Sequence, residues 1–282
     1  MRSRGFTLIE LVVTISLSSI VVSFMAAFIV TPMNAYSSLT RRAELVDDAD
    51  SALRLMARDL RIATPSSVRV AGSGAVSVIE MLRSVDGARY RDGGPLTDPT
   101  RELDFSAADG AFATTVPFSY INLPFSSSSN YLVIYNVGVP GANAWDRTNV
   151  ITPAGTTINI SAGATANEHL VTLSPSFRFA WGSPGKRVYL VEGPVSYLCD
   201  TSAATLTRYS GYAISSAQPA TATALLTAGA SAARVATDVG SCQFSYNAGT
   251  AQRSALATLT LQLTRGGERI QLLQQVHLVN AP

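Results

Sequence analysis

The chemistry that this chain can offer begins near its N-terminus, where one carboxylate stands at the edge of an apolar segment. Arg2 and Arg4 precede Glu10, and no charged residue occurs from Leu11 to Val30. A helix of about 20 apolar residues crosses the bilayer core, so this run predicts one membrane span. The basic flank predicts a cytoplasmic N-terminus and an exported remainder. A carboxylate within a span costs about 2.5–3.5 kcal/mol and usually has a partner.

Glu10 has no cationic partner within its own span, because no lysine or arginine lies between Phe6 and Val30. A cut after Gly5 would give Phe6 a free, positively charged amine. A neighbouring copy could then offer that amine to Glu10 inside the bilayer. The alternative interpretation is an uncleaved signal anchor that tolerates a glutamate.

Two cysteines, Cys199 and Cys242, are the other residues whose pairing would matter. An even number of cysteines in a chain that folds outside the cytoplasm favours a disulfide. By the chain-entropy model this bridge would contribute about 3–5 kcal/mol. Two buried free thiols are the alternative. The pair supplies too few nitrogen and sulfur ligands for a zinc site, and we expect no metal and no cofactor.

Catalytic motifs are absent from the sequence, which contains no HExxH, GxSxG or phosphate-binding loop. The two histidines, His169 and His277, lie in or beside apolar strand patterns, which favours structural or surface roles. Four acids that could line a calcium loop do not match EF-hand spacing: Glu80, Glu102, Asp104 and Asp109. We therefore expect no enzymatic activity. Several loop aromatics could form a sugar platform or belong to the core and subunit contacts: Phe118, Tyr120, Phe125, Tyr131, Tyr135 and Trp145.

Composition points away from nucleic acid as a partner. The chain has 282 residues, a formal net charge of +2 and only 14% charged residues. Removal of Arg2 and Arg4 with a leader would bring the side-chain charge to zero. A near-neutral chain gives no basic footprint for nucleic acid. The length suits one anchored domain, or a domain with a subdomain.

An amphipathic helix is predicted from Tyr36 to Ile62. Its proposed apolar stripe repeats every seven residues: Leu39, Val46, Leu53 and Leu60. Asp50 and Arg54 can pair at i,i+4, and Pro65 ends the helix. The acids Asp47, Asp48 and Asp50 are interpreted as a solvated face rather than a cation site.

Beyond Pro65 the pattern predicts strands joined by Ser/Gly/Ala/Asn/Pro-rich loops. Alternation is clearest at Leu259, Leu261 and Leu263, which share one face, and Gly266-Gly267 predicts a hairpin turn after them. The loop at 213–233 contains an Ala/Thr-rich stretch that could form a short helix. The predicted strands are Val68–Val70, Val76–Leu82, Tyr131–Val137, Thr156–Ile160, His169–Leu173, Arg187–Val191, Val195–Cys199, Thr205–Tyr209, Cys242–Tyr246, Ala255–Thr264 and Arg269–Val279.

The segment Gly5-Phe6-Thr7-Leu8-Ile9-Glu10-Leu11-Val12 resembles the class III signal of type IV pilins and type II secretion pseudopilins. The resemblance implies that a prepilin peptidase cuts between Gly5 and Phe6 and N-methylates Phe6, while the apolar segment is retained. It also implies that Glu10 engages the N-terminus of a neighbouring subunit. The helix-kinking proline of the family does not fall on Ala27; the nearest proline is Pro32.

Blocks of the C-terminal part are similar to the MshO-type minor pilins of mannose-sensitive haemagglutinin pili. The helix around Arg54–Leu60 also resembles the J-type pseudopilin of type II secretion. The K-type tip subunit lacks the acid found here as Glu10, which argues against that type. The MshO-like blocks are Gly87–Arg91, Val191–Asp200, Leu206–Tyr209 and Gln275–Pro282.

These resemblances imply an α+β, type IV pilin-like fold. Residues 1–5 would be the leader, 6–64 the helix with its transmembrane part at 6–30, and 65–282 a β-rich extracytoplasmic head. The implied function is a minor pilin at or near the tip of a type IV pilus that primes assembly. Its implied partners are other minor pilins, the major pilin, the prepilin peptidase and the inner-membrane assembly platform. The implied location is the inner membrane, single pass with a periplasmic head, and then the pilus at the cell surface.

Three other functions are compatible with the same sequence. A J-type pseudopilin belongs to the same structural class, and neighbouring genes would separate it from a pilus subunit. A tip adhesin would be favoured by exposed aromatics beside Asp or Asn in the loops at 118–135 or 142–149. A membrane-anchored exported enzyme would need a cleft that joins His169 or His277 to a carboxylate and a nucleophile.

Overall fold

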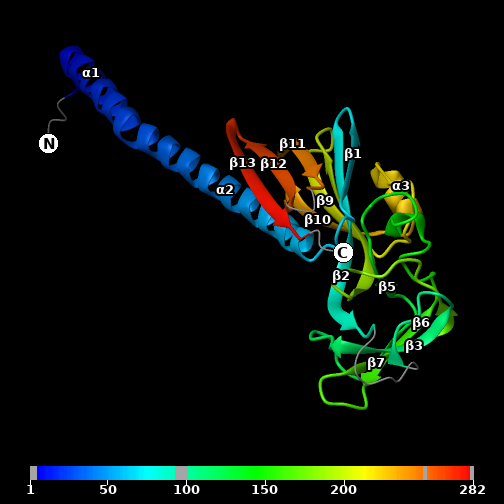
Figure 1. The fold of residues 1–282 in the computed structure, drawn as a ribbon. Coiled ribbons are helices and arrows are strands. Elements are labelled where there is room, and N and C mark those ends of the chain that lie inside the picture. Colours follow the sequence, from blue (N-terminus) through cyan, green and yellow to red (C-terminus); the bar gives the residue numbers. More distant parts are fainter. Residues whose placement is uncertain (1–4, 93–100, 250–252, 280–282) are drawn as a thin grey trace.

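The computed structural model describes residues 5–92, 101–249 and 253–279, and one long helix projects from a β-rich head (Figure 1). The helix comprises α1 (Leu8–Met25), a π-helical turn (Ala26–Val30) and α2 (Thr31–Arg61). Only its second half lies against the head (Figure 1). The predicted α+β fold, with a long N-terminal helix before antiparallel sheets, is confirmed.

Pro32 accounts for the π-helical turn. Proline has no N–H to donate to the carbonyl of Phe28, and its ring clashes with that carbonyl. The backbone relaxes by forming one wider turn at Ala26–Val30, directly before the proline, and then continues as an α-helix. The adjustment therefore falls on the segment around Ala27, although the proline lies five residues further on.

The first half of the helix is exposed along its whole length. No residue of α1 or of the π-helical turn is buried. Among the described residues, one helix, Leu8–Arg61, has the length and hydropathy to cross a membrane. Such a surface is stable in lipid or against other apolar helices and unstable in water.

The buried face of α2 differs from the predicted heptad stripe. Leu53 and Leu60 are buried as predicted, but Leu39 is 67% exposed and Val46 is 38% exposed. Leu39 precedes Leu45, the first buried residue of α2, and Val46 lies at the edge of the face that packs on the head. The face that packs on the head is Leu45, Ala49, Ala52, Leu53, Met56, Ala57, Asp59 and Leu60.

The described part of the head contains two antiparallel sheets. In the larger sheet the strand order is β10-β9-β8-β2-β3-β7-β6-β4, with β1 paired to β2 and β5 paired to β8. The smaller sheet has the order β11-β12-β13 and lies beside α2 (Figure 1). The lobe that contains β3, β6 and β7 lies away from the helix (Figure 1). The strand bounds are β1 (Arg69–Ser73), β2 (Val76–Tyr90), β3 (Asp109–Val116), β4 (Phe125–Ser127), β5 (Tyr131–Val133), β6 (Thr157–Ala162), β7 (His169–Phe177), β8 (Arg187–Asp200), β9 (Thr205–Ser210), β10 (Ser231–Thr237), β11 (Val239–Asn247), β12 (Ala255–Arg265) and β13 (Glu268–Leu278).

Strand β8 corrects the prediction of two separate strands at Arg187–Val191 and Val195–Cys199. The chain passes through Gly193 and Pro194 without leaving the sheet, and β8 pairs with β2 along most of its length. Arg83 faces Gly193 and Ser84 faces Val191, so Glu192 is an extra residue in β8. This is a β-bulge, and the positive φ of Gly193 (142°) fits the tendency of glycine to occupy irregular strand positions.

Three of the described strands were missed in regions of weak alternation. β3 and β4 lie in segments that gave no strand signal, and β10 occupies the end of the predicted loop at 213–233. The Ala/Thr-rich stretch in that loop does form a short helix, α3 (Ala222–Thr227). β5 ends at Val133, four residues before the predicted end. The predicted loop at 92–99 lies almost entirely outside the described residues.

The smaller sheet follows the sequence pattern closely. Leu259, Leu261 and Leu263 are fully buried on the face toward α2, and β12 and β13 form the predicted hairpin around Gly266-Gly267. A disulfide joins Cys199 of β8 to Cys242 of β11, with 6.5 Å between the Cα atoms. The bridge therefore connects the larger sheet to the smaller one.

Candidate functional site

The peptide bond between Gly5 and Phe6, the proposed cleavage site, is exposed to solvent. Gly5 and Phe6 are exposed ahead of α1, and no atom beyond the neighbouring residues lies within 4 Å of where a Cβ on Gly5 would be. The rest of the described chain therefore leaves the peptide bond between them uncovered. Arg2 and Arg4 of the predicted leader lie outside the described residues.

Glu10 forms a capping box with Thr7 at the start of α1. The Glu10 N–H donates to Thr7 Oγ1 over 3.3 Å, and the Thr7 N–H donates to Glu10 Oε2 over 3.5 Å. This arrangement satisfies two of the free N–H groups at the helix start. The carboxylate stays exposed and close to the chain start, so a cation from another molecule can reach it.

The hydroxyl groups in the apolar half of the helix do not need water. Ser16 donates to the carbonyl of Val12, Ser19 to that of Ser16, and Ser23 to that of Ser19, each over 2.8 Å. Hydroxyls that bond back to the helix are compatible with a lipid or helix-bundle environment. Three of the serine hydroxyls along these turns are therefore satisfied within the helix.

Two ionic clusters fix the helix to the head. At the hairpin turn, Arg265 pairs with Asp48 (3.0 Å) and Glu44 (3.6 Å) of α2 and with Asp238 (2.9 Å) between β10 and β11. Near the helix end, the buried Asp59 accepts hydrogen bonds from Tyr197 Oη and Arg208 Nε, each over 2.8 Å. Burial and the adjacent Asp59 raise the pKa of Tyr197, so its phenol stays a donor.

The acids Asp47, Asp48 and Asp50 do not form a metal-ion site. Asp48 belongs to the Arg265 cluster, and Asp50 pairs with Arg54 over 2.6 Å as predicted. Within residues 5–92, 101–249 and 253–279, no group of three or more His, Cys, Asp or Glu side chains is arranged to hold a metal ion.

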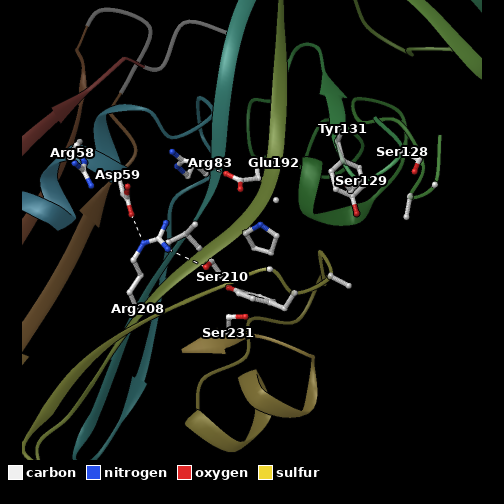
Figure 2. A pocket seen from close by; sticks show the side chains of 18 of the residues that line it. Arg58, Asp59, Arg83, Ser128, Ser129, Tyr131, Glu192, Arg208, Ser210 and Ser231 are labelled. Carbon is white, nitrogen blue, oxygen red and sulfur yellow. Dashed lines mark hydrogen bonds and ion pairs between the residues drawn. The ribbon is translucent and has the colours of Figure 1, made fainter. Parts of the chain in front are cut away.

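A groove of about 890 Å³ lies where the helix end meets the larger sheet (Figure 2). Arg58, Asp59 and Arg208 stand at one end, and Tyr131 with Ser128 and Ser129 at the other (Figure 2). The Arg83–Glu192 ion pair lies between these ends. The sequence analysis did not predict this groove. Its one local signal is Gly193-Pro194 within a strand pattern, which is typical of a β-bulge.

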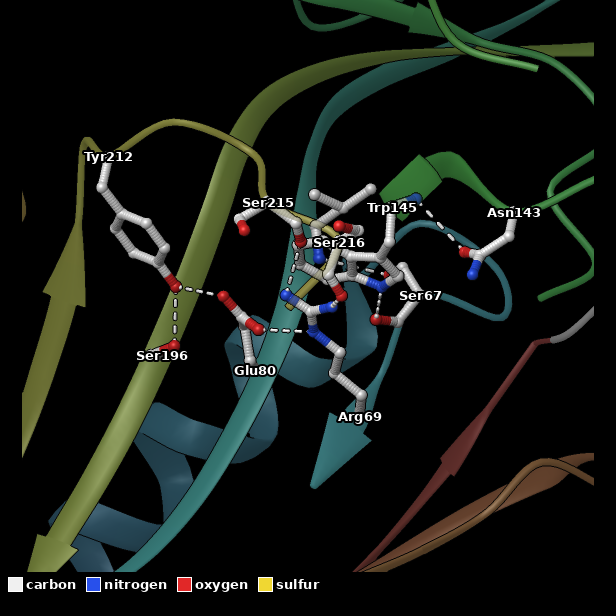
Figure 3. Close-up of polar contacts among 10 residues, drawn as sticks. Ser67, Arg69, Glu80, Asn143, Trp145, Ser196, Tyr212, Ser215 and Ser216 are labelled. Atoms are coloured by element: carbon white, nitrogen blue, oxygen red, sulfur yellow. Dashed lines mark hydrogen bonds and ion pairs between the residues drawn. The ribbon is translucent and has the colours of Figure 1, made fainter. Parts of the chain in front are cut away.

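A buried polar network stabilises the sheet beside this groove (Figure 3). Glu80 is fully buried and accepts from Arg69 Nε (2.6 Å) and Tyr212 Oη (2.7 Å). The Arg69 guanidinium lies 3.7 Å from the centroid of the Trp145 ring, and Trp145 Nε1 donates to the Ser67 carbonyl over 2.9 Å. Burial raises the pKa of Glu80, although Arg69 and Tyr212 each lower it.

The remaining candidate residues are dispersed. His169 stacks on Phe118 at a centroid distance of 6.4 Å, and burial lowers the pKa of its imidazole. Glu168 forms ion pairs with Arg91 and Arg101. His277 lies exposed on β13, in a different sheet from His169. No cleft joins either histidine to a carboxylate and a nucleophile in the described part of the chain.

The loop aromatics lie in different parts of the head, and the four acids considered for calcium do not form one group. Phe118 and Trp145 are buried, whereas Tyr120 is 85% exposed and Tyr131 lines the groove. Of the four acids considered for calcium, Asp104 and Asp109 are neighbours, since the Asp104 N–H donates to Asp109 Oδ2 over 3.0 Å. Glu80 lies in the buried network instead.

Comparison with known proteins gives one result for the N-terminal segment. A family model described as a prokaryotic N-terminal methylation motif matches residues 1–26. No curated protein and no solved structure matches the chain. The match, together with the single long apolar helix, supports a membrane-anchored, type IV pilin- or pseudopilin-like protein. The motif indicates a structural, pilin-like protein.

Proposed function

We propose that this chain is a minor pilin that acts at or near the tip of a type IV pilus and primes filament assembly. The observation that carries the proposal is the long exposed apolar helix with an exposed carboxylate, Glu10, in its first turn. In water or alone in a membrane, this helix has no protein partner for its apolar surface. Bundling with equivalent helices of other pilins would bury that surface and give Glu10 a cationic neighbour.

The proposed maturation starts with prepilin peptidase, which cuts between Gly5 and Phe6 and methylates the Phe6 amine. The chain then consists of a helix at 6–64 and a head at 65–282, held in the inner membrane with the head in the periplasm. Other minor pilins, the major pilin and the inner-membrane platform are the proposed partners. The resemblance of the head blocks to MshO-type minor pilins favours a pilus over a secretion system.

The maturation proposal is tested by intact mass and N-terminal sequencing of the membrane-extracted chain. The expected product begins with N-methyl-Phe6 and has no free thiol. A chain that retains Met1, or that is cut after the apolar run, contradicts the filament-subunit proposal.

The role of Glu10 is tested by two substitutions in the native host. Glu10→Gln keeps the shape and the capping acceptor but removes the charge, and Glu10→Ala removes both. We expect both variants to be processed but to lose co-purification with the other pilins. If Glu10→Gln assembles normally, Glu10 serves as a helix cap and the intermolecular ion pair is wrong.

A J-type pseudopilin is the competing assignment, favoured by the likeness around Arg54–Leu60. Deletion of the gene separates the two. Loss of surface pili with normal protein secretion supports the minor pilin, whereas loss of secretion with normal pili supports the pseudopilin.

A further inference from the structure

The groove at the helix end has the size and lining of a small-molecule site. Its volume of about 890 Å³ falls within the range typical of such sites. Its walls come from the end of α2, the bulge of β8, the segments at 128–131 and 154–155, and the segment at 208–213 with Ser231 (Figure 2). Distant parts of the sequence therefore converge on one concave surface.

The bulge of β8 sets the central ion pair of this groove. Because Glu192 is an extra residue between Val191 and Gly193, the local pairing with β2 shifts at Arg83 and Ser84. The Arg83 guanidinium and the Glu192 carboxylate form an ion pair beside the groove. Bulges commonly redirect side chains next to binding sites.

The groove has an excess of cationic groups over acids. Asp59 is already held by Arg208 and Tyr197, and Glu192 is held by Arg83. Arg58 is exposed and forms no ion pair with any described residue. The Arg83 side chain keeps 34% of its surface exposed while it pairs with Glu192. Guanidinium groups offer several N–H donors in a planar fork that suits a carboxylate.

The rest of the lining suits a hydroxylated ligand better than a protein partner. Ser128, Ser129, Ser210 and Ser231 contribute hydroxyls, and the half-buried ring of Tyr131 offers an aromatic face. Protein interfaces centre on dry pockets, whereas hydroxyl and charged groups make up much of this groove. Three arginines interleaved with two acids do not form the continuous basic track that nucleic acids need.

We propose that this groove binds a carboxylated saccharide, that is, a sugar of the uronic-acid class. Arg58 and Arg83 engage the carboxylate, the serine hydroxyls and Glu192 bond to the sugar hydroxyls, and Tyr131 packs against a ring face. This proposal adds a binding role to the head and does not depend on the assembly role proposed above. A failure here leaves the filament proposal intact, and the reverse is also true.

The test is calorimetric titration of the full chain in a detergent whose headgroup contains no sugar, at fixed salt. The probe is trigalacturonic acid, with maltotriose as the neutral saccharide and triglutamate as the acidic peptide. We expect saturable binding of trigalacturonic acid alone. Arg58→Gln and Arg83→Gln should each weaken that binding by about tenfold or more, because each removes a charge-assisted contact. Arg269→Gln, an exposed arginine on β13, is the matched control and should leave binding unchanged.

The folding of each variant is checked by its melting temperature and by the absence of free thiols. Arg58→Gln keeps the test decisive if Arg83→Gln fails to fold, because Arg58 is exposed and unpaired among the described residues. Three outcomes overturn the proposal: no saturable binding of trigalacturonic acid, equal binding of maltotriose or triglutamate, or a folded Arg58→Gln variant that binds like the unmodified chain. Equal binding of triglutamate would instead identify the groove as a site for acidic peptides.

Discussion

At the residue scale, the head relies on a few buried charges that each have several partners. Glu80 is fully buried, and Arg69 is its only cationic partner among the described ion pairs. Asp59 is held by Arg208 and Tyr197 at the point where α2 meets the sheet. Buried pairs of this kind add little net stability over an apolar core, but removal of one partner is costly.

Arg69→Ala should destabilise the head by about 3–5 kcal/mol near neutral pH, because it leaves Glu80 charged and buried. The loss of Arg69 raises the pKa of Glu80 further, since Arg69 lowers it in the native protein. A raised folded-state pKa means that the protonated carboxyl is favoured on folding. Stability should therefore be partly regained as the pH falls from about 7.5 to about 5.

The measurement is denaturant unfolding of the Arg69→Ala variant and the unmodified chain at both pH values. Arg69→Lys, which keeps the charge, is the control and should show a smaller deficit at about pH 7.5. A deficit that grows on acidification contradicts the assignment to a buried Glu80 charge.

Cys199→Ser together with Cys242→Ser should lower the free energy of unfolding by about 4 kcal/mol, from a bridge that spans 43 residues. The expected readout is a lower melting temperature for the variant in the absence of reductant. The unmodified chain treated with reductant should shift by a similar amount. If reduction leaves the melting temperature unchanged, the bridge contributes nothing to the stability of the head.

At the element scale, the helix is one rod with two environments. Its first half is apolar and exposed, and its second half packs through a narrow face on β12 and β13. The π-helical turn at Ala26–Val30 lies between these halves, where Pro32 removes one backbone donor. The buried face of α2 includes Leu53 and Leu60 of the predicted stripe but not Leu39 and Val46.

Leu53→Ala should cost about 2–5 kcal/mol of stability, because Leu53 is buried in the core between α2 and the smaller sheet. Val46→Ala, at a position that the heptad pattern wrongly placed in the core, should cost about 0.5 kcal/mol or less. Urea unfolding of both variants measures the difference. Equal losses would mean that the face of α2 is assigned incorrectly.

Pro32→Ala should restore the missing backbone donor and convert the wide turn to regular α-helix. Amide hydrogen exchange across Ala26–Pro32 in micelles should then slow several-fold relative to the unmodified chain. Exchange in the segment around Leu53, which lies far along the same helix, serves as the internal reference. Unchanged exchange before position 32 would show that proline is not the cause of the π-helical turn.

At the scale of the whole molecule, the direction of the rod relative to the head is set by a small number of contacts. The helix meets the head through the apolar face of α2, the Arg265 cluster and the Asp59 cluster. The disulfide holds the sheet that carries this helix to the larger sheet, which carries the groove. The exposed apolar half of the helix and the groove therefore lie in different parts of the molecule, and the end of α2 lines the groove.

Arg265→Glu should loosen the contact between α2 near residues 44–48 and the turn between β12 and β13. The substitution places a fourth acid among Glu44, Asp48 and Asp238. We expect faster hydrogen exchange around residues 44–48 at low salt and a smaller difference at high salt, since salt screens exposed charges. Arg269→Glu on β13 is the matched control. An effect that does not depend on salt would point to lost packing instead of repulsion.

Features that depend on local order could be predicted from the order of residues alone. The charge pattern around Glu10, the apolar run, the alternation at Leu259–Leu263 and the glycine turn are all short-range signals, and each corresponds to an observed element. The even cysteine count favoured a bridge that the structure contains. These predictions worked because the period of side chains along a helix or strand is a property of the chain itself.

Tertiary structure alone decided which surfaces meet. The contact face of α2 depends on where the smaller sheet lies, and β8 stays one strand because β2 provides hydrogen bonds on both sides of its bulge. The groove brings Arg58, Arg83, Tyr131 and Arg208 together from four separate segments. No periodicity relates these positions, because their proximity results from long-range strand pairing and packing, which act between residues that are far apart in the sequence.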